Sequence, residues 1–188
     1  MRTLDLNKRA AVCKSAMRLI TQLGFDGVSI AKIARDAGVS PATIYIYFEN
    51  KEDMINYLYI EAKKELSQFV LRNFEPGNDY EKIFKELFYQ HWFYFYQHPE
   101  SFAFIEQFSN SPLIAGISTE EGSSYYRPVL DLIQQAQSEG VLRPLPIPIL
   151  LSLAVAPLIR LAKLHASQNI QPQELETVID ILWHSIKA

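Results

Sequence analysis

Apolar residues recur at every third or fourth position through most of the chain, which is the spacing of one face of an α-helix. In the first such run Val12, Ala16 and Leu19 share a face with Ile20, and Gly24 follows where a helix commonly ends. No segment alternates apolar and polar residues between hairpin turns, so no strand is predicted. We therefore predict an all-α fold of about nine helices, over residues 10–23, 30–37, 41–48, 51–73, 79–98, 99–108, 123–139, 147–167 and 172–187, with a loop over 110–122.

Two of the short helices near the N-terminus are joined by a glycine turn. Ser29 is suited to cap the first helix, and Gly38 ends it. Ser40 caps the second helix, with Pro41 in its favoured first position. Two helices joined in this way form a helix-turn-helix, which places its second helix in the major groove of DNA. The sequence therefore predicts a three-helix DNA-binding domain over residues 1–53, followed by a helical ligand-binding and dimerisation domain over residues 54–188.

The second helix of this motif has an inward and an outward face. Ile44 and Phe48 lie four residues apart and point the same way, toward the first helix of the motif. The outward face carries short or uncharged side chains. There the hydroxyl of Thr43 can bond a base edge, whereas Ala42 and Ile46 can contact a thymine methyl group.

Phosphate groups need hydrogen-bond donors. Unpaired backbone N–H groups at the helix starts capped by Ser29 and Ser40 supply some of them. Tyr45, Tyr47 and Lys51 add side-chain donors, and we expect Tyr45 and Lys51 mainly to position the protein on phosphates. The alternative, in which both tyrosines are core aromatics, is geometrically awkward for residues that flank an outward position.

The net charge of −3 over 188 residues would by itself argue against a nucleic-acid binder. The distribution of charge changes that, because residues 1–53 carry a net +2 and residues 54–188 a net −5. A basic end on an acidic body confines the attraction for phosphate to one surface.

The sequence also bears on the compartment. Cys13 is the only cysteine, which excludes an intrachain disulfide and a thiolate-rich zinc site. The N-terminus lacks the apolar core of a secretory signal. The least polar run, residues 145–159, is shorter than the ~20 residues that span a bilayer and contains three prolines. We interpret it as a buried helix and expect a cytoplasmic protein with no membrane partner.

Residues 8–55 resemble the DNA-binding domain of the TetR family of bacterial transcriptional regulators. The match runs from the Leu-Gly-Phe after the first helix, through Gly-Val-Ser-Ile-Ala-Lys-Ile-Ala-Arg-Asp-Ala-Gly-Val-Ser, to Thr-Ile-Tyr-Ile-Tyr-Phe-Glu-Asn-Lys-Glu-Asp. The resemblance implies DNA contacts at Ser29, Ser40, Pro41, Ala42, Thr43, Tyr45, Tyr47 and Lys51. The chain departs from the family pattern at Ile46, where a tyrosine or another polar or large residue is common, and at Tyr47, where histidine is common.

Residues 80–108 hold twelve of the chain's twenty-three aromatic residues, on every side of the predicted helices. Core packing explains any one of them, but their density exceeds what a core of this size needs. Aromatic-lined concave sites bind small apolar ligands. The TetR resemblance implies an inducer pocket within the C-terminal helices. We expect it to be lined by Phe88, Trp92, Phe95, Phe104, Phe108 and Tyr125, with His91 or Tyr126 as a polar group.

The last two predicted helices are more apolar than a chain of this length readily covers. Residues 147–164 carry only two charges, Arg160 and Lys163, and residues 172–187 place six apolar side chains on one side. An interface between two copies would cover these helices, and the resemblance implies a two-fold, four-helix interface. We therefore expect a homodimer through the last two helices, with Trp183 or its neighbours near the seam.

The sequence contains no motif for catalysis. Its four histidines have neither the spacing of metal ligands nor an acidic cluster beside them, and no phosphate-binding loop or nucleophile motif occurs. No cofactor, metal site or catalytic residue is predicted. We expect a homodimeric repressor that binds a double-stranded DNA operator and is released by a small hydrophobic or aromatic ligand. The alternatives are a regulator controlled by a protein partner, without an inducer, and an all-α enzyme that uses the aromatic cavity.

Overall fold

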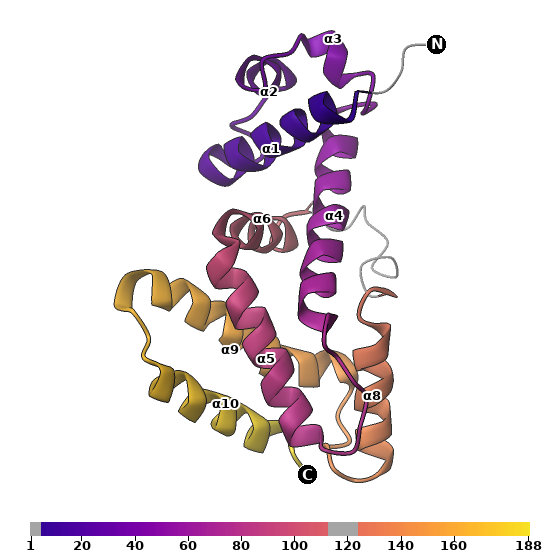
Figure 1. Cartoon of the computed structure of the whole chain (residues 1–188), viewed down its shortest axis with the longest axis vertical. Helices are drawn as coiled ribbons and strands as arrows, with labels where there is room; N and C mark the ends of the chain where they lie inside the picture. Colours follow the sequence, from indigo (N-terminus) through magenta and orange to yellow (C-terminus); the bar gives the residue numbers. More distant parts are fainter. Residues whose placement is uncertain (1–4, 113–123) are drawn as a thin grey trace. The chain divides into compact units, whose positions relative to one another are not determined.

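The structure is a computed structural model that describes residues 5–112 and 124–188. The predicted all-α fold is confirmed, since these residues form nine helices and only one isolated antiparallel bridge, between Leu142 and Lys187. Figure 1 shows the helices, which are α1 (Leu6–Leu23), α2 (Ile30–Asp36), α3 (Pro41–Ile44), α4 (Lys51–Leu71), α5 (Tyr80–Gln97), α6 (Pro99–Ser109), α8 (Arg127–Ser138), α9 (Ile147–Gln168) and α10 (Pro172–Ile186).

Two helices are four or five residues shorter than predicted, and α1 begins at Leu6, four residues before its predicted start. The α-helical bonding of α3 ends at Ile44, and the chain continues to Phe48 through tight turns in which the Tyr47 N–H donates to the Ile44 carbonyl at 2.9 Å. Helix α8 begins at Arg127, because a proline follows in its first turn, where the missing N–H costs no helical bond. Most of the loop predicted over residues 110–122 lies outside the described residues.

The chain divides into two compact units, which we describe separately. Unit 1 comprises Met1–Glu65 and His98–Gly122, and unit 2 comprises Leu66–Gln97 and Ser123–Ala188. The division falls within α4, because this long helix contributes its first part to unit 1 and its last part to unit 2. The functional division after residue 53 stays a prediction.

The core of unit 1 is built on an aromatic cluster. Helix α1 packs against α2 and α6, and its Val12, Ala16 and Ile20 are fully buried. The ring of Tyr59 stacks on Phe108 at 4.2 Å between centroids, and that of Phe25 meets Phe108 edge-on at 5.9 Å. This cluster takes up Phe104 and Phe108, two of the twelve aromatic residues within residues 80–108.

The core of unit 2 lies among α5, α8, α9 and α10, with α5 packed on both α9 and α10. Its buried residues are Tyr80, Ile83, Leu132, Ala136, Leu142, Leu150, Trp183 and Ile186. Trp183 is only 3% exposed because the apolar face of α10 packs inside the unit. Trp183 is thus a core residue of unit 2, and the expectation that Trp183 or its neighbours lie near a dimer seam stays a prediction.

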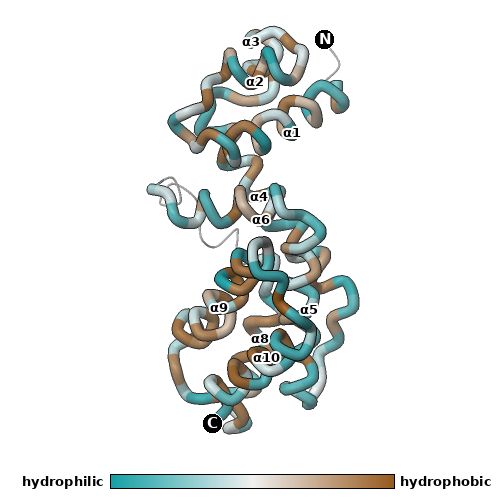
Figure 2. The backbone as a smooth tube through the Cα atoms, turned by 90° about the vertical axis from the view of Figure 1, so that its left-hand side faces the viewer, coloured by the Kyte–Doolittle hydropathy of each residue, from teal (hydrophilic) through white to brown (hydrophobic). Residues whose placement is uncertain are grey.

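Helix α9 is the least covered apolar element of the described chain. Its stretch Ile147–His165 has a mean hydropathy of 1.9, long and apolar enough to cross a membrane by length and composition, yet only 11% of it is buried. Figure 2 shows hydrophobic colour along much of α9. Ile149, Leu153 and Val155 are exposed. Our interpretation of this run as a buried helix is wrong for the single chain, because unit 2 covers one side of the helix only.

Candidate nucleic-acid interface and apolar cavity

The local geometry of the helix-turn-helix follows from its caps. The Ser29 Oγ accepts from the Lys32 N–H at 3.3 Å and starts α2, and the Ser40 Oγ accepts from the Thr43 N–H at 3.3 Å and starts α3. Gly38, between them, has φ +67°, a backbone conformation that side-chain-bearing residues rarely adopt. The sequence prediction of these caps and of the glycine turn is confirmed.

The two faces of α3 and the turn after it differ as predicted. Ile44 and Phe48 are buried, at 0% and 3% exposure, and anchor the segment to unit 1. Ala42 is exposed, and Tyr45 and Ile46 are 57% and 48% exposed. About half of each of these two large side chains is therefore accessible to a partner. Ser29, Ser40 and Pro41 are exposed as well, so six of the nine predicted DNA-contacting residues lie open to a partner.

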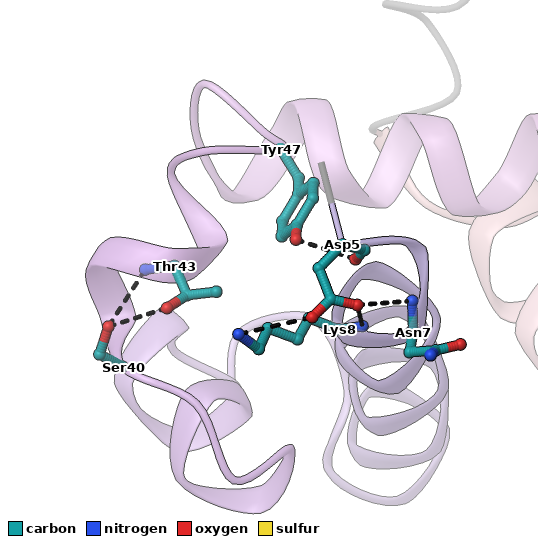
Figure 3. Close-up of polar contacts among 6 residues, drawn as sticks. All are labelled: Asp5, Asn7, Lys8, Ser40, Thr43 and Tyr47. Carbon is teal, nitrogen blue, oxygen red and sulfur yellow. Dashed lines mark hydrogen bonds and ion pairs between the residues drawn. The ribbon is translucent and has the colours of Figure 1, made fainter. Parts of the chain in front are cut away.

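The other three predicted residues use their polar atoms within unit 1. The Thr43 Oγ1 bonds the Ser40 Oγ at 2.9 Å, and the Tyr47 hydroxyl donates to the Asp5 carbonyl at 3.0 Å (Figure 3). The Lys51 ammonium donates to the carbonyls of Phe25 at 2.6 Å and Val28 at 2.9 Å. The contacts of Tyr47 and Lys51 link segments far apart in sequence, and no local pattern predicted them.

Two arginines of α1, which sequence reasoning did not single out, also hold the helix-turn-helix in place. The Arg9 guanidinium lies over the Tyr57 ring, 4.2 Å from its centroid, and within 5.7 Å of the Phe48 ring. Arg18 forms an ion pair with Asp36 at the end of α2, and this hydrogen bond holds the pKa of the Asp36 carboxyl below its usual value. Both contacts fix α1 against the motif, so they position the outward face of α3.

Replacing Lys51 by methionine should lower the free energy of unfolding of unit 1 by about 2 kcal/mol. Methionine keeps the apolar part of the side chain but cannot make the two hydrogen bonds that the Lys51 ammonium donates. Hydrogen bonds from a charged donor contribute ~1.5–3 kcal/mol each, and water bonded to the two freed carbonyls recovers part of that energy. Urea unfolding followed by circular dichroism measures the change. Lys14→Met, on the exposed side of α1, is the matched control and should leave the midpoint unchanged. Equal midpoints for the two variants would show that the turn does not need Lys51.

Unit 2 contains an apolar cavity of about 120 Å³ between α5, α8, α9 and α10. Its walls are almost entirely hydrocarbon. The lining residues are Tyr80, Ile83, Phe84, Leu87, Phe88, His91, Val129, Leu132, Ile133, Ala136, Leu142, Leu150, Leu151, Ala154, Val155, Leu158, Trp183 and Ile186.

His91 is the lining residue of α5 that carries an imidazole ring, and its hydrogen bonds indicate which ring nitrogen is protonated. Its Nδ1 lies 2.8 Å from the Leu87 carbonyl, which can only accept, so Nδ1 carries the proton. Its Nε2 then accepts from the Tyr126 hydroxyl at 3.3 Å, and the two rings stack with centroids 5.8 Å apart. Burial raises the pKa of Tyr126 and keeps its hydroxyl protonated. The His91 ring and the Tyr126 hydroxyl are therefore engaged with each other.

Of the eight residues predicted to line a ligand pocket, Phe88 and His91 line this cavity. The Trp92 ring packs edge-on against His165 at 5.1 Å, and Phe95 packs beside Tyr94. Phe104 and Phe108 belong to the aromatic cluster of unit 1, while Tyr125 is half-buried and Tyr126 bonds His91 from outside the lining. The structure does not bring these six residues into the unit 2 cavity.

Sequence reasoning missed the aliphatic walls of the cavity because it followed aromatic density. The signal was present in α8, where Val129, Leu132, Ile133 and Ala136 follow the i, i+3, i+4, i+7 pattern of one helix face. A face of this kind predicts burial, and only its partners in α5, α9 and α10 make it the wall of a cavity.

Comparison with known proteins identifies relatives along the whole chain. Residues 12–58 match a family described as "Bacterial regulatory proteins, tetR family", and residues 80–187 match "Tetracyclin repressor-like, C-terminal domain". An uncharacterized HTH-type transcriptional regulator of Haemophilus influenzae is 24% identical over the full length of both chains. A fatty acid metabolism regulator protein of Bacillus subtilis is 37% identical over 65 residues, 35% of this chain and 32% of that one. The crystal structure of a TetR family transcription regulator from Marinobacter aquaeolei superposes with a TM-score of 0.87 at 26% identity, covering 100% of this chain and 99% of that one.

Proposed function

Because the chain belongs to the TetR family of bacterial transcriptional regulators, which are DNA-binding proteins and not enzymes, we propose that it is a cytoplasmic, homodimeric repressor. It leaves its operator when a small apolar ligand fills the unit 2 cavity. The observation that carries this proposal is the coexistence in one chain of an exposed reading face, an uncovered apolar helix and an apolar cavity.

The reading face is the outward side of α3 and the turn after it. Ala42 and Ile46 are suited to contact thymine methyl groups in the major groove. The hydroxyl of the exposed Tyr45 is suited to hydrogen-bond a phosphate. The starts of α2 and α3, capped by Ser29 and Ser40, offer further N–H donors to phosphates. Lys51 and Tyr47 act mainly by holding this face in place.

The dimer interface is the exposed apolar side of α9, together with α10. A soluble monomer rarely leaves so large an apolar surface open to water. A two-fold pairing of the last two helices would cover this surface on both copies of the chain. A dimer also supplies two reading heads, which match the two half-sites of a palindromic operator.

The ligand site is the unit 2 cavity. An apolar cavity of comparable size, about 150 Å³, holds benzene in an engineered protein, so a volume of about 120 Å³ in the free chain suits a small apolar ligand. A preformed cavity supports a small-molecule inducer over control by a protein partner. The ligand acts by population shift, since it favours the arrangement in which the two heads no longer match successive major grooves.

Recovery of bound DNA from the source genome, followed by sedimentation and fluorescence anisotropy, tests this function. We expect a particle of twice the chain's 21.6 kDa that binds a palindromic fragment as one dimer and is released by an apolar ligand. A folded monomer that binds a single half-site with full affinity would contradict the proposal.

A further inference from the structure

We propose that the ligand of the unit 2 cavity is an uncharged, mainly aliphatic molecule, and not a carboxylate, a phosphate-bearing conjugate or an amine. This inference rests on the proposed function, because it assigns a chemical class to the inducer of that site. It is carried by the composition of the walls and by the surroundings of the few polar groups among them.

The walls supply hydrocarbon contacts and no charge. Thirteen of the eighteen lining residues are aliphatic, and none of the eighteen is Lys, Arg, Asp or Glu. A charged group buried among such walls loses its hydration and gains no partner, which is strongly unfavourable. An alkyl chain or ring instead gains contact with α5, α8, α9 and α10 at the same time.

Two of the three polar side chains at the walls are already committed, whereas the buried Nε1–H of the third, Trp183, has no hydrogen-bond partner. The Tyr80 hydroxyl donates to the Glu139 carboxylate at 2.7 Å, so the polar group at this position is backed by a negative charge. His91 donates to the Leu87 carbonyl and accepts from Tyr126. A ligand carboxylate would therefore meet no positive charge and would be repelled by Glu139. The Trp183 Nε1–H is a neutral donor that suits the oxygen of an uncharged ligand such as an alcohol.

The neighbouring cation on α5 is also committed. The Lys85 ammonium bonds the carboxylates of Glu81 and Asp180, each at 2.8 Å, and this pairing raises the pKa of the ammonium. Its charge is balanced outside the cavity by two acids. An anionic ligand would have to displace one of them, whereas an uncharged ligand leaves the pairing intact.

Isothermal titration of the full-length dimer at pH 8 with matched straight-chain probes tests the proposal. The probes are butan-1-ol, pentan-1-ol and hexan-1-ol, whose sizes suit the cavity, and the carboxylate and amine of each chain length. The expected result is that each alcohol binds at least about 100-fold more tightly than the carboxylate and amine of equal length, because an unpaired carboxylate in apolar surroundings binds only as its rare protonated acid. Carboxylates that bind as tightly as the alcohols would overturn it.

A charge placed in the wall gives a second, independent readout. Val129→Lys should reverse the preference toward the carboxylates, whereas Val129→Met, which has similar reach and no charge, should keep the preference for alcohols. Release of operator DNA is measured in parallel. Release by carboxylates but not by alcohols would overturn the ligand class and leave the proposed function standing. A dimer that binds none of the probes would overturn both the ligand class and the inducer role of the cavity.

Discussion

A Leu153→Glu variant is expected to remain folded but to lose dimerisation, with the dissociation constant of the dimer raised about 1,000-fold or more. Leu153 lies on the exposed apolar side of α9 and is 38% exposed, so it is not one of the buried core residues of unit 2. In a two-fold interface the substitution occurs twice, and each buried, unpaired carboxylate costs several kcal/mol. Sedimentation equilibrium measures the loss, and operator affinity should fall with it, because one head binds one half-site.

Leu150→Glu is the matched control for this prediction, since the same residue type is changed three positions earlier on the same helix. Leu150 is 3% exposed and lines the cavity and core of unit 2. Its replacement removes packing worth about 2–5 kcal/mol and buries a charge, so unit 2 should lose cooperative unfolding. If Leu153→Glu also unfolded, or if it sedimented as the native dimer, the exposed side of α9 would not be the interface.

The parts of the fold that could be predicted from the sequence are those that depend on local chemistry. Ser29, Gly38 and Ser40 act on neighbours within four residues, so their caps and turn follow from the chain alone. Helical periodicity likewise located the helices to within a few residues. Three helix ends differ by four residues. Helix α1 begins earlier than predicted, α8 begins later, and α3 ends early because tight turns replace its last predicted helical turn.

The parts that could not be predicted depend on contacts distant in sequence. Nothing near Lys51 shows that its ammonium bonds two carbonyls of the turn between α1 and α2. Periodicity shows that a face is apolar but not what covers it. The apolar face of α10 is therefore equally consistent with packing in the core and with packing in a dimer interface. The structure places Trp183 in the core of unit 2. Aromatic density gave the same ambiguity, since Phe104 and Phe108 proved to be packing residues of unit 1.

An Ala42→Asp variant is expected to bind operator DNA about 100-fold more weakly while keeping its stability. Ala42 is exposed in the first turn of α3, where an aspartate is compatible with the helix because its charge favours the N-terminal dipole. Facing DNA, the same carboxylate would lie among phosphates and base edges, and repulsion there offsets the cation contacts that dominate affinity. Fluorescence anisotropy at fixed salt measures the change.

Ala10→Asp is the control for this prediction, because it adds an identical charge at an exposed position of α1 in the same unit. Both variants alter the net charge equally, so a general electrostatic effect on DNA attraction would weaken them by the same factor. A contact made by the outward face of α3 instead weakens Ala42→Asp alone by the larger factor, at equal melting temperature. Equal losses for the two variants would mean that the reading face lies elsewhere in unit 1.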